Sequence, residues 1–290
     1  MPDYIAPTFK DYAYGPHERH LLDFWQAESP TPTPLAIFIH GGAFLVGRKE
    51  TINVRVLREL LDAGVSVGAI NYRLLSHAPL PAAHHDGRRA LQFFRSKAED
   101  WNLDKGRVGA FGTSAGAQIC MWLGFHDEMA DLASPDPIER ESTRLTCVAA
   151  DSAQTTMDVE WWQQWIPGYD TPHRDFYKTF DVKLKSAYLK EVADVSALSL
   201  VSKVAPPLLL SYSMSPNDPI PTQTQKAFLW KVHHVIFGVK LKDKMDAMGL
   251  EAHLNYPGVR PRYSSIPHFF KAKLKAHAAS MVRRAPAFAV

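Results

Sequence analysis

The sequence predicts an α/β fold with a mostly parallel central sheet flanked by helices. Short apolar runs alternate with longer amphipathic stretches along most of the 290 residues, and strands that alternate with helices in this way imply right-handed βαβ crossovers. The composition agrees: 46% hydrophobic residues, 22% charged residues and a formal net charge of +3 describe a globular chain and exclude intrinsic disorder. No internal repeat is present, which excludes solenoids and propellers.

The first half of the chain contains five predicted strands and three predicted helices. Residues 35–39 form a continuous apolar run, as expected of a strand buried on both faces. Apolar positions at helical spacing follow in residues 51–63, and Gly64 ends that helix. The predicted strands are residues 11–15, 20–26, 35–39, 65–72 and 107–111, and the predicted helices are residues 51–63, 81–101 and 114–125.

The second half continues the same alternation after one interruption. Residues 154–197 show no clean pattern but contain Trp161, Trp162 and Trp165 before a Pro-Gly turn. We expect this segment to be an insertion that forms a partial lid over one edge of the sheet. The remaining predicted strands are residues 145–150, 207–212 and 251–256, and the remaining predicted helices are residues 222–248 and 268–283.

A Gly-x-Ser-x-Gly pattern, Gly112 to Gly116, lies between a predicted strand and a predicted helix. A sharp reversal there would expose Ser114 at the carboxyl edge of the sheet with strained backbone angles. The flanking glycines are needed because side chains would collide with the neighbouring strand and helix. Backbone N–H groups at the start of the helix, led by that of Ala115, could then stabilise an oxyanion. The pattern predicts Ser114 as a nucleophile.

A second glycine-containing loop, His40-Gly41-Gly42-Ala43-Phe44, directly follows the buried strand 35–39. Small residues let the backbone approach a substrate closely, so that the N–H groups of Gly41 and Gly42 can point at developing negative charge. We expect His40 to hold the backbone of its own loop by hydrogen bonding.

These motifs together resemble a known family. His-Gly-Gly, then residues 71–74 (Asn-Tyr-Arg-Leu) and 79–83 (Pro-Leu-Pro-Ala-Ala), then Gly-x-Ser-Ala-Gly, are similar to the α/β-hydrolase esterases of the hormone-sensitive-lipase-like and feruloyl/acetyl-xylan-esterase-like (BD-FAE-type) groups. The resemblance covers most of the chain and implies the α/β-hydrolase fold and serine carboxylesterase activity without a cofactor. Ala43 stands where many relatives carry a third glycine, which favours simple esters over tertiary ones.

A serine nucleophile needs a histidine base and a carboxylate that orients it, in the chain order Ser, Asp or Glu, His in this fold. Of the late histidines, His253 lies within a predicted strand and His277 within a lysine-rich helix, whereas His268 begins the last helix, where the resemblance places the base. Asp218 lies in a turn resembling the family's Asp-Pro-x-Val-Pro and is the predicted acid. Asp151, after the strand 145–150, is its rival. A site drawn from residues 114, 218 and 268 implies one domain, residues 1–290.

The substrate is expected to be a small-molecule ester with a short acyl group, acetyl or feruloyl esters of carbohydrates among them, since Phe44, Trp161, Trp162 and Trp165 could line its site. Two alternatives stay open. The same triad serves arylformamidase-type amide hydrolysis, and a chain in which His268 cannot reach Ser114 would be a catalytically silent ligand-binding protein, because Ile266-Pro267-His268-Phe269-Phe270 lacks the glycine that often follows the base in relatives.

Several other features are expected to be structural. Cys120 and Cys147 are predicted to be buried free thiols, and the resemblance suggests that Asp86 pairs with Arg73. The pairs His84-His85 and His233-His234 lack a third ligand, so no metal site is expected. The alternating lysines of residues 240–244 and 271–275 scatter around their helices, which favours a solvated surface over nucleic-acid binding.

No run of apolar residues is long enough for a membrane span, and residues 1–15 lack the features of a secretory signal. We therefore expect a soluble protein, either cytoplasmic or exported with its signal removed. The resemblance is also compatible with a homodimer formed through edge strands or the C-terminal helix.

Overall fold

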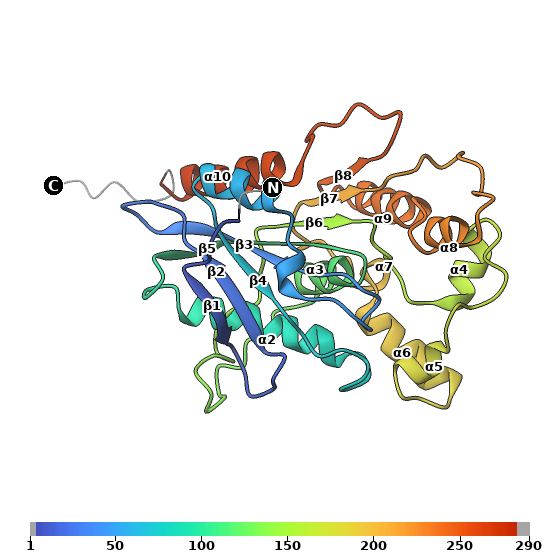
Figure 1. Cartoon of the computed structure of the whole chain (residues 1–290), viewed down its shortest axis with the longest axis horizontal. Helices are drawn as coiled ribbons and strands as arrows, with labels where there is room; N and C mark the ends of the chain where they lie inside the picture. The colour runs from blue at the N-terminus through green and yellow to red at the C-terminus, as the bar shows by residue number, and fades with distance from the viewer. Residues whose placement is uncertain (1–3, 283–290) are drawn as a thin grey trace.

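The computed structural model describes residues 4–282, with side chains up to residue 275, and contains an eight-stranded sheet with helices on both faces (Figure 1). The predicted α/β-hydrolase fold is confirmed. The strands are β1 (Phe9–Ala13), β2 (Leu21–Trp25), β3 (Thr33–Ile39), β4 (Ser66–Ile70), β5 (Leu103–Thr113), β6 (Cys147–Asp151), β7 (Leu208–Ser211) and β8 (Ala252–Asn255). The principal helices of the layers are α1 (Val54–Asp62), α2 (Ala82–Ser96), α3 (Ala115–Phe125), α9 (Ile236–Ala247) and α10 (Ile266–Val282), with a short 3-10 turn, η1 (Lys49–Thr51), before α1.

The strand order is β1-β2-β4-β3-β5-β6-β7-β8. The strand β2 pairs antiparallel with both β1 and β4, and every other pair is parallel. The two central strands, β3 and β5, run side by side, with Ile39 paired to Gly112 near their carboxyl ends. This register brings the loop after β3 next to the turn after β5, so the two motifs singled out in the sequence meet at one edge of the sheet.

Two hydrophobic cores fill the space between the sheet and its helices. The helices α1 and α10 lie together against one face, and α2, α3 and α9 cover the other (Figure 1). Cys120 belongs to the core beneath α3, whereas Cys147 belongs to the core beneath α10. Both are buried, free thiols, and the sheet separates them because they lie in different cores.

The predicted helix over residues 222–248 is wrong in one respect, because it is two helices, α8 (Thr224–Val232) and α9. The chain leaves the helical conformation at His233, whose backbone has φ −121° and ψ 25°. The ring Nδ1 of His234 then accepts a hydrogen bond from the N–H of Ile236, one of the first N–H groups of α9, at 3.2 Å. A side chain that satisfies an N–H group left unpaired at a helix start stabilises a new helix there, so the two adjacent histidines mark the break.

Residues 152–207 connect β6 to β7 and contain four short helices: α4 (Val159–Trp165), α5 (Phe176–Thr179), α6 (Lys185–Val195) and α7 (Ala197–Leu200). In Figure 1, α4 lies next to α8 at one end of the molecule, and α5 and α6 lie together below them. Asp158 starts α4, because its carboxylate accepts hydrogen bonds from the N–H groups of Glu160 and Trp161. This connection contains the predicted lid segment 154–197.

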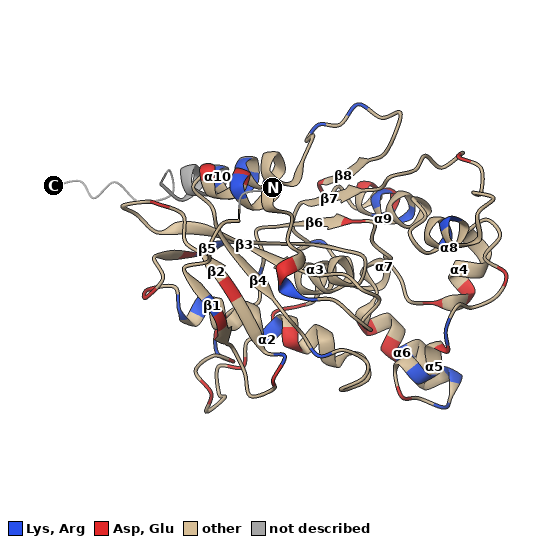
Figure 2. Cartoon of the chain, in the orientation of Figure 1, with Lys and Arg blue, Asp and Glu red and all other residues tan. Residues whose placement is uncertain are grey.

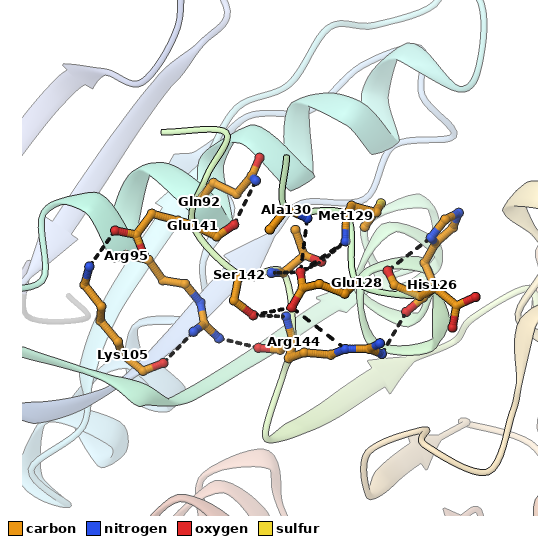
Figure 3. Close-up of polar contacts among 12 residues, drawn as sticks. Gln92, Arg95, Lys105, His126, Glu128, Met129, Ala130, Glu141, Ser142 and Arg144 are labelled. Atoms are coloured by element: carbon orange, nitrogen blue, oxygen red, sulfur yellow. Dashed lines mark hydrogen bonds and ion pairs between the residues drawn. The ribbon is translucent and has the colours of Figure 1, made fainter. Parts of the chain in front are cut away.

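The loop between α3 and β6 is attached to α2 and to itself by polar contacts (Figure 3). The guanidinium of Arg95 donates to the carbonyl groups of Lys105 and Arg144, which ties α2 to the start of β5 and to this loop. Burial raises the pKa of Glu128, but hydrogen bonds from Ser142 and Thr143 outweigh that effect and lower the pKa to about 2. The carboxylate therefore stays ionised and fixes the loop before β6.

A buried ion cluster joins the N-terminal hairpin to η1. The side chain of Lys49 is 0% exposed, and its Nζ lies 2.6 Å from Asp11, 2.7 Å from Glu50 and 3.0 Å from Asp23. Burial alone would lower the pKa of Lys49, but the hydrogen bonds to these three carboxylates raise it above its usual value. The cluster holds β1 and β2 against the segment that follows the loop 40–44.

Charged residues of both signs are interspersed over the molecule, and few lie on the central strands (Figure 2). Within the described residues, no helix is both long and apolar enough to cross a bilayer. Three lysines of α9 have different partners: Lys240 lies over the ring of Trp165, Lys242 pairs with Asp246, and Lys244 donates to the carbonyl of Leu198. No group of three potential metal ligands occurs in the part of the chain that the structure describes.

Because His84 is buried, we expect the stability of the folded protein to decrease in acid. His84 is 0% exposed, its two ring nitrogens have no partner among the described residues, and burial lowers its pKa from 6.5 to about 3. The unfolded chain therefore takes up a proton as the pH falls below 6.5 while the folded chain does not, and stability is lost at about 1.4 kcal/mol per pH unit.

We expect His84→Phe, which preserves the contacts with Phe44 and Trp122, to reduce the stability lost between pH 7 and pH 5 by about 2 kcal/mol. Urea unfolding at both pH values measures this. His268→Phe is the control, because His268 is exposed. An equal loss in wild type and His84→Phe would contradict the assignment.

Candidate active site

Ser114 lies at a sharp turn between β5 and α3, as predicted. Its backbone has φ 53° and ψ −119°, in the left-handed range that side-chain-bearing residues rarely adopt. Its N–H donates to the carbonyl of Asp151 at the end of β6, at 2.9 Å. The neighbouring strand thus holds the strained turn in place and leaves the hydroxyl at the carboxyl edge of the sheet.

The two glycines of the turn are required by close backbone approach. A Cβ on Gly116 would lie 2.0 Å from the carbonyl oxygen of Ile39, and a Cβ on Gly112 would lie 2.5 Å from the same atom. Because Ile39 belongs to the buried central strand β3, its carbonyl has no room to move. The expected collision with a neighbouring strand is confirmed.

The histidine that contacts the serine is His233. Its Nε2 lies 3.0 Å from Oγ of Ser114, and its Nδ1 lies 3.1 Å from the carbonyl oxygen of Leu229. A carbonyl can only accept, so Nδ1 carries the hydrogen and Nε2 presents a lone pair to the serine hydroxyl. Burial lowers the pKa of His233, although the hydrogen bond to Leu229 opposes this. The neutral imidazole that a general base requires is therefore present at neutral pH.

The structure does not bring His268 to Ser114. It lies at the exposed start of α10, where its Nδ1 is 3.4 Å from Oγ of Ser264 and its ring lies edge-on to Tyr263. It lines a separate surface hollow with Glu59 and Lys271, next to α1. The prediction of His268 as the partner of Ser114 is corrected to His233, because the loop 256–265 leads the chain to the α1 side of the sheet before α10 begins.

The remaining late histidines have other positions. His253 lies in β8 and its Nε2 is 2.7 Å from a carboxylate oxygen of Glu251. The helix α10 includes residue 277, but the side chain of His277 lies outside the described residues.

The two candidate carboxylates, Asp218 and Asp151, have different surroundings. Asp218 is exposed and accepts a hydrogen bond from the N–H of Ser215 at 2.8 Å, and it lines a hollow that His233 also lines. Asp151 lies beneath the turn, and its carboxyl pKa is raised by burial, against hydrogen bonds from Ser152 and Thr113. Nδ1 of His233 is occupied by the Leu229 carbonyl, so neither carboxylate bonds to it in this structure.

The loop after β3 lies against the serine turn. A Cβ on Gly41 would lie 2.7 Å from the carbonyl oxygen of Thr113 and 3.5 Å from Cβ of Ser114. His40 is fully buried, with Nδ1 2.7 Å from the carbonyl oxygen of Gly41, and its ring stacks on Tyr72 at 4.2 Å. Burial lowers the pKa of His40 to about 4, so it acts as a neutral brace for the loop, as expected from the sequence.

The site opens into a cavity of about 700 Å³. Ser114, Gly41, Gly42 and His233 line it, together with residues of the loop 43–46, of the connection between β6 and β7, which includes α4 and α5, and of α8. Of the residues expected to line a substrate site, Phe44 and Trp162 do so. Trp161 stacks on Phe237 and Trp165 lies under Lys240, and neither lines the cavity.

The predicted pair between Arg73 and Asp86 is confirmed, with Nη2 of Arg73 2.6 Å from the Asp86 carboxylate. His20 lies 3.0 Å from the same carboxylate. Burial raises the pKa of Asp86, but hydrogen bonds from His20 and Arg73 lower it to about 2, so this acid stays ionised within the fold.

Comparison with known proteins identifies the family of the chain. The BD-FAE family model matches residues 22–231. The chain is 26% identical over 229 residues to the esterase LipC of Mycobacterium tuberculosis, which covers 77% of this chain and 54% of the relative. It is 28% identical over 154 residues to probable carboxylesterase 2 of Arabidopsis thaliana, covering 48% of this chain and 49% of the relative. The chain thus spans about half the length of these curated relatives.

A solved structure with the same fold is the truncated form of a carbohydrate esterase from gut microbiota. It superposes with a TM-score of 0.68 and 20% sequence identity, covering 95% of each chain. At this identity the likeness concerns the fold, which extends over nearly the whole chain.

Proposed function

Because the chain belongs to the BD-FAE family, we propose that it is a carboxylic ester hydrolase in which Ser114 is the nucleophile and His233 the general base. The observation that carries the proposal is the 3.0 Å contact between Oγ of Ser114 and Nε2 of His233 at the strained turn after β5. The esterase LipC and the probable carboxylesterase among the relatives support the same reaction class.

In the proposed reaction, Oγ of Ser114 attacks the ester carbonyl carbon while its proton passes to Nε2 of His233. The tetrahedral intermediate expels the alcohol, which takes the proton from His233, and an acyl-enzyme remains. Water then attacks the acyl carbon with His233 again as base, and the acid is released. The carbonyl of Leu229 keeps the imidazole in the tautomer that both steps need.

The N–H groups of Gly41, Gly42 and Ala115 are the proposed oxyanion hole. The close approach of Gly41 to Thr113 and Ser114 supports this role, because it places the loop backbone beside the attacking oxygen. Ala115 is the first residue of α3, so its N–H has no partner within the helix. Donors fixed in this way stabilise the charge that develops on the carbonyl oxygen. Asp218 as the acid that assists His233 stays a prediction.

The proposed substrate is an ester with a short acyl group, in which a carbohydrate or phenolic alcohol is one option. The cavity supports this choice, because Phe44, Trp162, Phe176 and Phe228 give it aromatic walls within about 700 Å³. The carbohydrate esterase with the same fold is consistent with it. A small-molecule substrate binds without a further partner, and the homodimer stays a prediction.

Labelling by a fluorophosphonate probe tests the proposal. We expect stoichiometric modification of Ser114, identified by peptide mass spectrometry, together with hydrolysis of p-nitrophenyl acetate. Ser114→Ala should abolish both, and Ser152→Ala, which removes another serine lining the same cavity, should preserve both. Absence of labelling and turnover in folded wild type would instead indicate a silent ligand-binding protein. Turnover of N-formylkynurenine in preference to esters would indicate the amide hydrolase.

A further inference from the structure

An arginine lies in the cavity that contains Ser114. Arg174, in the connection between β6 and β7, is half-buried, and the lining also includes His173 and His233 but no described aspartate or glutamate. No carboxylate among the described residues forms an ion pair with Arg174. The half-buried Arg73 and Arg89 each have one, whereas Arg19 and Arg95 instead donate to backbone carbonyl groups. An unpaired guanidinium in an aromatic cavity costs solvation energy, and a bound anion would recover it.

The guanidinium is held in a fixed orientation. Nε of Arg174 donates to Nε2 of His173 at 3.0 Å, and Nη1 donates to the carbonyl of Ala43 at 3.1 Å. Burial lowers the pKa of His173 to about 4, so this imidazole is neutral and accepts the hydrogen bond. Nδ1 of His173 lies 2.7 Å from the hydroxyl of Tyr169, and its ring stacks on Trp162. Nη2 makes no hydrogen bond to a described residue, so its N–H groups are available to a ligand.

Arg174 lies close to the groups that are proposed to react. Ala43 belongs to the loop that carries Gly41 and Gly42, and it accepts the hydrogen bond from Nη1 of Arg174. The guanidinium therefore contacts the proposed oxyanion loop, and Arg174 lines the same cavity as Ser114 and His233. The planar donor fork of a guanidinium matches the geometry of a carboxylate or a phosphate, and of these two groups we take the carboxylate as the one that an ester substrate carries.

From these contacts we infer that the substrate is an ester carrying a carboxylate, which Arg174 binds through its free Nη2. This inference rests on the proposed function and narrows its substrate class. Arg174 is then a specificity-determining residue: it distinguishes an anionic ester from its neutral counterpart.

Two pairs of esters test the inference and locate the carboxylate. The first pair is 3-acetoxybenzoate, which carries a carboxylate on the alcohol side of the acetyl ester, and its methyl ester, in which that carboxylate is replaced by a neutral group. In the second, monophenyl adipate and its methyl ester carry the carboxylate, or its neutral replacement, on the acyl side. In at least one pair we expect wild type to favour the anionic ester in kcat/KM by about 10- to 100-fold, as for one charge-assisted hydrogen bond.

We expect Arg174→Met to remove this preference while changing kcat/KM for the neutral ester less than about threefold. Lys178→Met, which removes an exposed cation of α5, should behave as wild type. Equal losses on both esters would mean that Arg174 only supports the Ala43 loop, and would overturn the inference, as would the absence of a preference in both pairs.

If no ester is hydrolysed, the proposed function fails and binding decides the inference by itself. Calorimetric titration of 3-hydroxybenzoate and adipate into wild type and Arg174→Met measures it. Binding to wild type that is at least about tenfold weaker in Arg174→Met supports the carboxylate site. No binding to wild type, or equal binding to both proteins, overturns it.

Discussion

His233→Ala is expected to lower kcat for p-nitrophenyl acetate by about 10⁴- to 10⁶-fold, close to the loss in Ser114→Ala. Oγ lies 3.0 Å from Nε2, and without the imidazole no other described side chain that could take its proton is bonded to Oγ. A double variant should be no slower than either single variant, because nucleophile and base act as one unit.

His268→Ala is the matched control for this experiment. His268 is an exposed residue at the start of α10, so its removal should change kcat less than about threefold. A large loss in His268→Ala with activity retained in His233→Ala would mean that the loop 256–265 rearranges to bring His268 to the serine. It would restore the base expected from the sequence.

Lys49→Met is expected to destabilise the protein by about 3–5 kcal/mol, because it leaves the carboxylate of Asp23 buried without its counter-ion. The side chain of Asp23 is 5% exposed and that of Lys49 is 0% exposed. The N–H of Asp11 also donates to Asp23 at 2.8 Å, but that contact does not neutralise the charge. Urea unfolding at pH 7 measures the difference in free energy.

Lys97→Met provides the comparison. Lys97 forms a salt bridge with Asp100 in which the two side chains are 31% and 65% exposed, and such surface pairs contribute about 0–1 kcal/mol. Similar small effects for both variants would show that the hairpin β1–β2 is not held by the cluster.

The predictable part of the site was the part formed by contiguous residues. The sharp turn at Ser114 could be predicted from residues 112–116 alone. A serine between two glycines, directly after a strand and directly before a helix, is compatible with only one sharp reversal of the chain. The same holds for Gly41 and Gly42 after β3. The meeting of the two loops followed from the parallel order of the sheet, because adjacent strands end at the same edge.

The sequence does not single out His233, the proposed base, because its position depends on a helix break that the pattern does not reveal. Apolar spacing continues through residues 222–248 and hides the break, so the sequence presents His233 only as one of two adjacent histidines in a helix. Two features of the sequence favour His233: it follows the expected acid, Asp218, in the chain, and it lies at a possible helix end. His268 satisfied the chain order equally well, and only the path of the loop 256–265 separates the two. The family match ends at residue 231, before either histidine.

Ser114 is the N-cap of α3, and His233 is the C-cap of α8. In the proposed reaction, attack by Oγ creates negative charge on the substrate oxygen, and transfer of its proton creates positive charge on the imidazole. The aligned peptide dipoles of α3 present their positive end to the first charge, and those of α8 present their negative end to the second. Two helix ends thus favour the charge-separated state from opposite sides, and α8 supplies by its backbone some of the stabilisation of the imidazolium that a triad carboxylate would give.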